Sequence, residues 1–365
     1  MNRVAMKFVP IKKIAAVLMM ITLVLSLTAC SVNDNNDKII ETRETDIQTE
    51  SSELDTTTGS DETETTSVIN DEARAVKNIL MIGNSNCYYY VEELCGIAGA
   101  AGKEINLCNL YYSGCSLEKH WDFYSNNKNE YQLFYTTYIT SKAGGMVLRS
   151  LIPIDTFTNA LNLARKRFGG DWDVISLQQT GYYTLVGSAA SAEPYTLPYA
   201  EKLYGVIREK CPDAMLYWHQ QWAYEIGYGA NKADQREHVN SLEKQKEQHN
   251  AIRELAYTVA KAENVNIIPT GDAWQLACTN AKIGQTLCAR KGVNNDLGDC
   301  DHDGDIGGGQ YLTACVWFEV LMRESCVGNT WRPDNYVLSE EKIAILQNAA
   351  HEAVAAVYGE DYLIK

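Results

Sequence analysis

Short apolar runs alternate with amphipathic segments along the chain from residue 78 onward. Five of these runs predict buried parallel strands, because a strand covered by helices on both faces is apolar at nearly every position. The predicted strands span residues 78–83, 105–114, 173–179, 214–222 and 265–274. Helical patterns follow the first strand up to residue 102 and recur at 156–168, 199–210, 236–263, 311–323 and 339–358.

This alternation predicts an α/β fold, a three-layer α/β/α sandwich with a mostly parallel five-stranded sheet and right-handed crossovers. Ligands of such folds bind at the carboxyl ends of the strands, so the residues after each strand are the first candidates for function. The segment 126–150 fits neither pattern and is predicted to be an insertion at the rim of the site. No internal repeat is visible.

The first thirty residues have the pattern of a targeting segment. Four basic residues precede an uncharged apolar stretch at 14–29, shorter than the roughly 20 residues of a spanning helix. The segment ends in Leu27-Thr28-Ala29-Cys30, which resembles the lipobox of bacterial lipoproteins. That resemblance implies lipidation of Cys30 and a location on the outer face of the cell membrane, held by the lipid anchor alone. An ordinary signal peptide that happens to end in cysteine is the alternative.

Residues 31–75 are predicted to be a disordered tether. They contain 13 acidic and 3 basic residues and no aromatic residue, so they offer too little apolar surface to offset the entropy of ordering. The domain predicted at 76–365 is acidic as well, within a chain of net charge −15. Nucleic acid is therefore excluded as a partner, because phosphate recognition needs a basic surface.

The eleven cysteines of the chain form no C-x-x-C pair, so no zinc framework is expected. Cys278, Cys288 and Cys300 are placed on predicted loops and are the best candidates for disulfides outside the cytoplasm. Cys315 falls in an apolar helix and is predicted to be a core residue.

Ser85 follows the first predicted strand in the stretch Ile82-Gly83-Asn84-Ser85-Asn86. A serine at a strand-to-helix turn presents its hydroxyl at the carboxyl edge of the sheet, where the positive end of the following helix stabilises an alkoxide. The alternative is that Asn84 and Ser85 only cap the helix. Neither G-x-G-x-x-G nor a G-K-[ST] ending is present, so nucleotide binding is not expected.

A nucleophilic serine needs a histidine base, and His302 is the strongest candidate among six histidines. It lies on a predicted loop, with Asp299 three residues before it, so the carboxylate can orient the imidazole. His120 and His219 are read as structural histidines or substrate contacts. His238 and His249 are predicted to be solvated on the long charged helix, and His351 has no evident partner.

These motifs together resemble the SGNH (GDSL-like) hydrolases, as an uncharacterised surface lipoprotein branch of that superfamily. "IGNS" resembles the first block, with Ser85 as nucleophile and Asn84 where aspartate is more usual. "SGCS" resembles the second block, whose glycine donates its backbone N–H to the oxyanion and is Gly114 here. "DCDH" resembles the last block, with Asp299 and His302 completing the triad.

The third block of the family departs from the usual pattern in this chain. "DVISLQQ" occupies its place, but Gln178 and Gln179 stand where an asparagine usually donates to the oxyanion. Gln178 is the predicted third donor, with Gln179 left as the alternative.

The stretch Asp299–Gly308 also fits part of a calcium loop, which remains an alternative. Acidic residues fall at positions 1, 3 and 5 and a glycine at position 6, as in an EF-hand, but Gln310 stands at position 12 in place of the bidentate glutamate. An ion held by Asp301, Asp303 and Asp305 without Asp299 is also open, as is a merely solvated loop. The main prediction includes no metal and no cofactor.

The predicted function is that of an extracytoplasmic serine esterase. The family resemblance implies small acyl esters, and the location suggests acetyl groups on carbohydrates. Aromatic residues expected at the rim suit stacking on sugar rings, although ordinary packing accounts for part of them; they are Tyr111, Tyr112, Trp121, Tyr182, Tyr183 and Trp222. The alternative is a non-catalytic glycan-binding lipoprotein with a calcium loop at 299–310, and phosphodiester hydrolysis would need metal ligands that are not visible near Ser85.

Overall fold

The computed structural model describes residues 76–131, 137–142, 146–151, 156–185, 192–224, 226, 239–280, 308–334 and 337–363. Its centre is a seven-stranded sheet in the order β4-β3-β2-β1-β5-β6-β7. The strands are β1 (Asn78–Gly83), β2 (Ile105–Tyr111), β3 (Thr137–Lys142), β4 (Met146–Leu151), β5 (Val174–Leu177), β6 (Met215–His219) and β7 (Asn266–Ile268).

The five predicted strands are confirmed as the parallel part of the sheet, β2-β1-β5-β6-β7. All six residues of β1 are buried, because helices cover both faces of this central strand. β1 ends level with β2, where Gly83 pairs with Tyr111, and with β5, where Ile82 pairs with Leu177. The residues that follow these three strands therefore meet at one edge.

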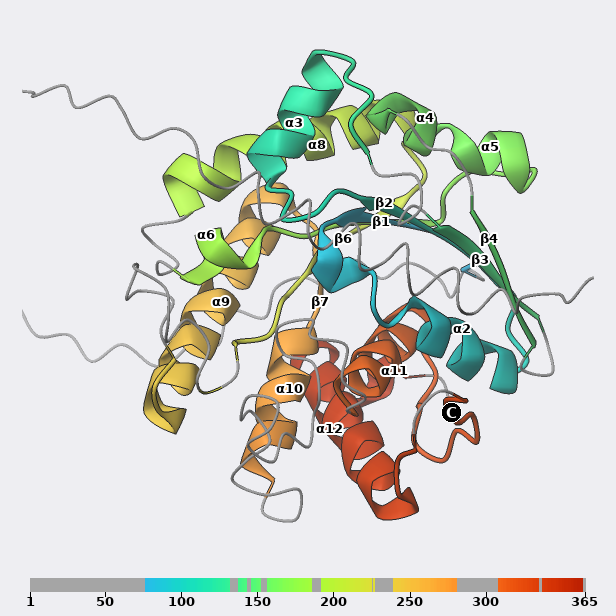
Figure 1. Cartoon of the computed structure of the whole chain (residues 1–365), viewed down its shortest axis with the longest axis vertical. Coiled ribbons are helices and arrows are strands. Elements are labelled where there is room, and N and C mark those ends of the chain that lie inside the picture. The colour runs from blue at the N-terminus through green and yellow to red at the C-terminus, as the bar shows by residue number, and fades with distance from the viewer. Residues whose placement is uncertain are drawn as a thin grey trace, which may run out of the picture. The chain divides into compact units, whose positions relative to one another are not determined.

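Helices cover the two faces of the sheet, so the three-layer α/β/α prediction is confirmed (Figure 1). One face carries α2 (Val91–Ala100), α10 (Thr270–Thr279), α11 (Gly308–Met322) and α12 (Glu340–Tyr358). The other carries α3 (Leu117–Ser125), α4 (Phe157–Leu161), α5 (Leu163–Arg167), α8 (Leu197–Lys210) and α9 (Leu242–Glu263). Shorter helical elements are η1 (Ser85–Cys87), α6 (Gly181–Leu185), η2 (Ala192–Thr196) and η4 (Glu360–Tyr362).

The prediction of a patternless insertion at 126–150 is wrong. This segment contributes β3 and most of β4, and β3 pairs antiparallel with β2, which extends the sheet beyond the five parallel strands. "TYITSK" and "MVLRSL" lack the continuous apolar run of a doubly covered strand. Antiparallel strands at a sheet edge do not require such a run, and the sequence reading missed them for that reason.

The last predicted strand is too long, since β7 covers only Asn266–Ile268 and α10 begins at Thr270. Pro269 ends the strand pairing because it has no N–H to donate. Gly271 allows the start of α10 to lie close to the residues that follow β6, since a Cβ there would lie 2.1 Å from the backbone oxygen of Gln221.

The described cysteines divide into one disulfide-bonded residue and seven free thiols. Cys278 is disulfide-bonded but lies on α10 rather than on a loop, and its partner is outside the described residues, as are Cys288 and Cys300. Cys315 is a free, fully buried core residue on α11, as predicted. Within the described ranges no helix combines the length and the apolar character needed to cross a membrane.

Candidate functional site

Ser85 lies just beyond the carboxyl end of the central strand. β1 ends at Gly83. Ser85 is the first residue of η1, which is one turn of 3₁₀ helix with Asn84 at its N-cap. Ser85 is half-buried. α2 begins only at Val91, so the element that directly holds Ser85 is the capped 3₁₀ turn rather than the positive end of a long helix.

The side chain of Asn84 connects three strand ends. Its Oδ1 accepts hydrogen bonds from the backbone N–H of Asn86 at 3.0 Å and from Nε2 of Gln178 at 3.3 Å. Its Nδ2 donates to the carbonyl oxygen of Cys115 at 3.3 Å. Ser85, the loop after β2 and the first residue after β5 are thus joined through one carboxamide.

Gly114 lies in the loop after β2 and has φ +59°, a conformation that favours glycine. The N–H of Cys115 donates to the carbonyl of Tyr112 at 3.1 Å, which closes a turn around Gly114. Gly114 itself is exposed. The turn therefore leaves the Gly114 backbone at the surface, beside the loop end that Asn84 binds.

The two glutamines after β5 have different surroundings. Oε1 of Gln179 accepts from the N–H groups of Leu117 and Thr180, and its Nε2 donates to Tyr195 O and Thr196 Oγ1. A carboxamide offers two N–H donors, so Gln179 has none left for a substrate. Gln178 is fully buried and uses one N–H to reach Asn84, while its Oε1 has no hydrogen-bond partner among the described residues. Within the described part of the chain, Gln178 is therefore the glutamine with an N–H left over.

Two of the histidines, His120 and His219, are fully buried. His120, one turn into α3, hydrogen-bonds Gly83 O through Nε2 at 3.2 Å and Tyr131 Oη through Nδ1 at 2.8 Å. His219, the last residue of β6, is packed among aromatic rings, and neither ring nitrogen has a hydrogen-bond partner within the described part of the chain. Burial lowers the pKa of each to about 3, so both rings are neutral near pH 7.

Two predictions about the remaining histidines are wrong. His249 is not solvated but buried, with Nε2 3.4 Å from Asp272 Oδ1. His351 does have a partner, Glu319, at 3.3 Å from Nδ1. Both partners lie on helices distant in sequence, and no local pattern indicates them.

The remaining predicted site residues lie outside the described residues. These are Asp299, His302, the possible calcium ligands Asp301, Asp303 and Asp305, the lipidation residue Cys30, and also His238. Among the residues that the structure describes, no three His, Cys, Asp or Glu side chains are grouped as metal ligands.

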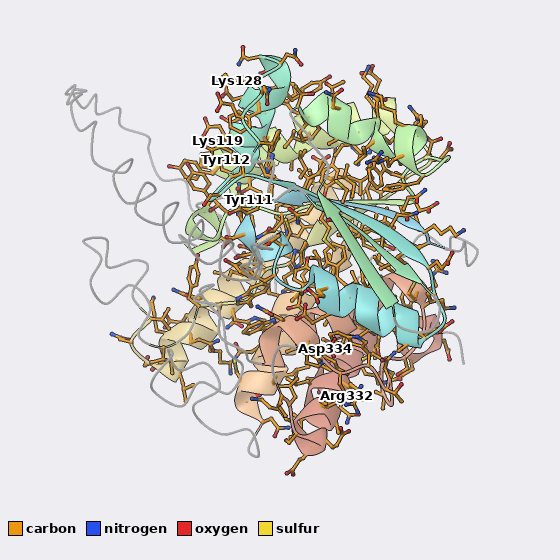
Figure 2. The ribbon with its side chains drawn as sticks, turned by 45° about the vertical axis from the view of Figure 1, so that its right-hand side comes forward. Tyr111, Tyr112, Lys119, Lys128, Arg332 and Asp334 are labelled. Carbon is orange, nitrogen blue, oxygen red and sulfur yellow. The ribbon has the colours of Figure 1, made fainter. Side chains whose placement is uncertain are left out.

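Two of the aromatic residues predicted at the rim, Tyr111 and Tyr112, lie at the end of β2, which is level with the end of β1. Tyr88, three residues after Ser85, packs against Tyr111 with ring centroids 5.9 Å apart. Tyr112 is half-buried, and Nζ of Lys119 lies 4.1 Å from its ring centroid. Figure 2 shows Tyr111, Tyr112 and Lys119 close together near the end of β2.

Others of this set have different surroundings. Trp222 is a core residue, stacked on Trp274 at 4.8 Å. Tyr183 stacks on the exposed Tyr195 at 4.5 Å, and Trp121 is half-buried. The side chain of Tyr182 lies outside the described part.

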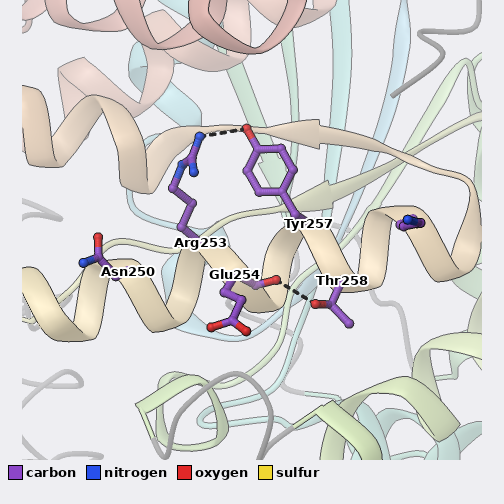
Figure 3. A pocket seen from close by; sticks show the side chains of 6 residues that line it. Asn250, Arg253, Glu254, Tyr257 and Thr258 are labelled. Carbon is purple, nitrogen blue, oxygen red and sulfur yellow. Dashed lines mark hydrogen bonds between the residues drawn. The ribbon is translucent and has the colours of Figure 1, made fainter. Parts of the chain in front are cut away.

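A surface groove of about 470 Å³ lies along α9, apart from the Ser85 turn. Its lining consists of α9 side chains alone, and Arg253 donates to Tyr257 Oη at 3.4 Å (Figure 3). Arg253 also pairs with Asp272 at 3.2 Å. The carboxylate of Asp272 thus compensates the charge of Arg253. The groove contains none of the groups gathered around Ser85.

Residues 78–353 match the family described as Domain of unknown function (DUF4886). The crystal structure of a DUF4886 family protein from Bacteroides uniformis is similar over 78% of this chain and 95% of its own, with 24% identity and a TM-score of 0.57, and it has the same fold. Structural neighbours also include a putative GDSL-like lipase from Parabacteroides merdae (14% identity, 69% of this chain and 99% of that one, TM-score 0.35). Another is a GDSL-like lipase from Bacteroides thetaiotaomicron (10% identity, 67% and 87%, TM-score 0.32). No curated protein matches the sequence.

Proposed function

The chain belongs to the family described as Domain of unknown function (DUF4886), and we propose that it is a serine esterase with Ser85 as its nucleophile. One observation carries this proposal: the Asn84 carboxamide joins the Ser85 turn, the loop after Gly114 and the Gln178 side chain. Acyl transfer needs a nucleophile surrounded by fixed N–H donors that stabilise the developing oxyanion. These three groups are the proposed donors, and they come from strand ends that meet at one edge of the sheet.

In the proposed mechanism, His302 takes the proton of Ser85 as Oγ attacks the ester carbonyl, and Asp299 orients the imidazole. The negative charge that develops on the carbonyl oxygen is stabilised by the N–H groups of Ser85 and Gly114 and by Nε2 of Gln178. His302 then gives the proton to the departing alcohol, which leaves an acyl group on Ser85. His302 then takes a proton from a water molecule whose oxygen attacks the acyl carbonyl. The bond from the acyl carbon to Ser85 Oγ breaks, His302 returns the proton to Oγ, and the acid leaves.

The proposed substrates are acetyl or other small acyl esters on carbohydrates. The half-buried rings of Tyr88, three residues after Ser85, and Tyr112, directly after β2, support this choice because aromatic side chains present large, flat apolar faces. Lipidation of Cys30 and action outside the cell belong to the same proposal. They rest on the apolar N-terminal stretch and the sequence Leu27-Thr28-Ala29-Cys30.

The test is hydrolysis of 4-nitrophenyl acetate by the full-length chain in mild detergent, alongside Ser85→Ala and His302→Ala. We expect the rate of both variants to fall to background and the rate of the unsubstituted chain to be indifferent to chelator. Equal background rates in all three proteins would reject the esterase. A melting temperature that chelator lowers would then favour the alternative, a glycan-binding protein with a calcium loop at 299–310.

A further inference from the structure

We propose that Asn84 is a positioning residue that aligns all three donors of the oxyanion site, and that it must be a carboxamide to do so. The inference rests on the proposed esterase function and assigns a role that helix capping alone does not include. Asn84 is only 3% exposed. Water therefore does not compete for its hydrogen bonds, and the bonds are correspondingly costly to lose.

The bond from Asn86 N–H to Asn84 Oδ1 fixes the turn that carries the nucleophile. Asn84 has extended backbone angles, φ −120° and ψ −152°, and its side chain caps η1. Because Ser85 lies between the two bonded residues, this cap sets the direction in which the Ser85 N–H points. The first donor is thereby fixed relative to Asn84.

The bond from Asn84 Nδ2 to Cys115 O fixes the loop that carries the second donor. Cys115 is also held through its N–H, which donates to Tyr112 O at 3.1 Å. Cys115, the neighbour of Gly114, is thus bonded through both its N–H and its carbonyl group. Gly114 has no side chain to hold its own backbone, so the Asn84 bond limits how far its N–H can turn.

The bond between Gln178 Nε2 and Asn84 Oδ1 selects the orientation of the third donor. Oε1 of Gln178 has no hydrogen-bond partner in the described part of the chain, so no bond at that atom opposes a half-turn of the carboxamide. Such a half-turn would exchange the NH₂ group for the oxygen, and an oxygen facing an oxyanion is repulsive. Asn84 disfavours it, because two acceptor oxygens would then face each other.

An aspartate at position 84 would keep both acceptor roles and lose the donor role. Its second oxygen would face Cys115 O, with repulsion in place of a hydrogen bond. Asn84→Asp therefore breaks the link to the Gly114 loop while leaving the η1 cap and the Gln178 contact available. Asn84→Ser keeps only an acceptor short enough for the cap, so it loses the links to both Cys115 and Gln178.

The chain offers a matched control at the opposite end of the same strand. Asn78, 7% exposed, donates through Nδ2 to Asp171 O at 2.8 Å, and its Oδ1 accepts from Asn106 Nδ2 at 2.8 Å. Asn78→Asp therefore removes the same kind of buried amide donor from the edge of the sheet that lies away from Ser85. It reports the cost of the substitution to folding, as an upper limit, because Asp173 Oδ2 accepts the N–H of Asn78 at 2.8 Å and its carboxylate would also repel the new one.

The experiment measures kcat and KM for 4-nitrophenyl acetate and the melting temperature of full-length Asn84→Asp, Asn84→Ser and Asn78→Asp. Removing one oxyanion donor costs about 10²–10³ in kcat, so we expect misalignment in Asn84→Asp to lower kcat roughly 10- to 100-fold, and Asn84→Ser to lower it further. KM should change less than about threefold, because the oxyanion exists only in the transition state. Asn78→Asp should lose comparable stability with kcat within about twofold of the unsubstituted chain. Equal effects of Asn84→Asp and Asn78→Asp on kcat would overturn the inference.

A second measurement separates this inference from the esterase proposal. Amide hydrogen exchange of the segments 84–87 and 112–116 should become faster in Asn84→Asp and stay unchanged in Asn78→Asp, whether or not the chain hydrolyses esters. Unchanged exchange in Asn84→Asp would overturn the alignment role even in an active enzyme. A Ser85→Ala variant as active as the unsubstituted chain would reject Ser85 as the nucleophile, and the exchange result would then decide the alignment role alone.

Discussion

His120 Nε2 lies 3.2 Å from the carbonyl oxygen of Gly83, and Nδ1 of the same ring lies 2.8 Å from the hydroxyl of Tyr131. A carbonyl oxygen can only accept, so Nε2 carries the proton and Nδ1 accepts from the tyrosine. This tautomer is neutral, in agreement with the lowered pKa of the buried ring. The histidine thus binds the end of β1 directly before the Ser85 turn.

His120→Leu should destabilise the protein by about 2–4 kcal/mol, because it leaves two buried polar partners, Gly83 O and Tyr131 Oη, without their bonds. Chemical denaturation at pH 7 measures the free energy of unfolding. Lys166→Ala, at an exposed position on α5, serves as the control and should change the same quantity by less than about 0.5 kcal/mol. Equal stability of the two variants would contradict the buried role of His120.

Stability should fall as the solution becomes acidic below pH 6.5. Burial lowers the pKa of His120 and of His219 from 6.5 to about 3, so between these values the unfolded chain binds protons that the folded chain does not. The stabilising contribution is complete above pH 6.5 and is lost as the pH drops, with a slope approaching about 1.4 kcal/mol per pH unit for each histidine. Denaturation midpoints measured between pH 7 and pH 5 test this direction.

His219→Phe should reduce that pH dependence without lowering stability at pH 7 by more than about 1.5 kcal/mol. Neither ring nitrogen of His219 has a hydrogen-bond partner among the described residues, so the substitution breaks no such bond. The centroid of the ring lies 5.2 Å from that of Trp317 and 5.8 Å from that of Tyr90. The slope averaged between pH 7 and pH 5 should decrease by about 1 kcal/mol per pH unit. His120→Leu provides the contrast, since it should reduce the slope and also weaken the protein at pH 7. An unaltered slope in His219→Phe would show that His219 is not the titrating group.

Gly83→Ala should reduce esterase activity at least tenfold and cost about 1–3 kcal/mol of stability. The added Cβ would lie 2.6 Å from Oε1 of Gln178 and 3.0 Å from Sγ of Cys87, so the Gln178 carboxamide has to move. Gly170→Ala is the matched control, because its nearest contact is an ordinary 3.6 Å to Asn78 Nδ2. Steady-state kinetics and thermal unfolding of both variants test the prediction, which fails if Gly83→Ala retains full activity.

Gly205→Ala should stabilise the protein by about 0.5–1 kcal/mol. Gly205 is exposed on α8, and outside its own stretch of helix no described residue has an atom within 4 Å of the position of an added Cβ. Alanine loses less backbone entropy in a helix than glycine does. Thermal unfolding gives the answer, and a lower melting temperature would count against it.

The parallel part of the fold could be predicted because strands buried on both faces are apolar at nearly every position, which is visible in the sequence. β1 and β5 consist entirely of buried residues and are read directly as apolar runs. β3 and β4 show no such apolar run, because antiparallel strands need not be buried on both faces. Their existence depends on the exposed edge of β2, which a local pattern does not reveal.

The sequence could indicate which residues are candidates for the site, but not which partners their side chains bind. Successive residues of an extended chain point to opposite sides, so Gln178 reaches Asn84 while Gln179 reaches Leu117 and Thr196. Two adjacent glutamines look equivalent in a sequence, and only the neighbouring loops distinguish them. The same holds for His249, whose partner Asp272 lies on another helix.

The direction of β1 has a consequence for a protein held at a surface. The described chain enters the domain at Lys77, whose N–H is bound by Asp173 at the amino end of β1, and it passes Ser85 only after the strand has crossed the sheet. If Cys30 carries the proposed lipid anchor, that anchor is connected to the domain at the end of β1 opposite to Ser85.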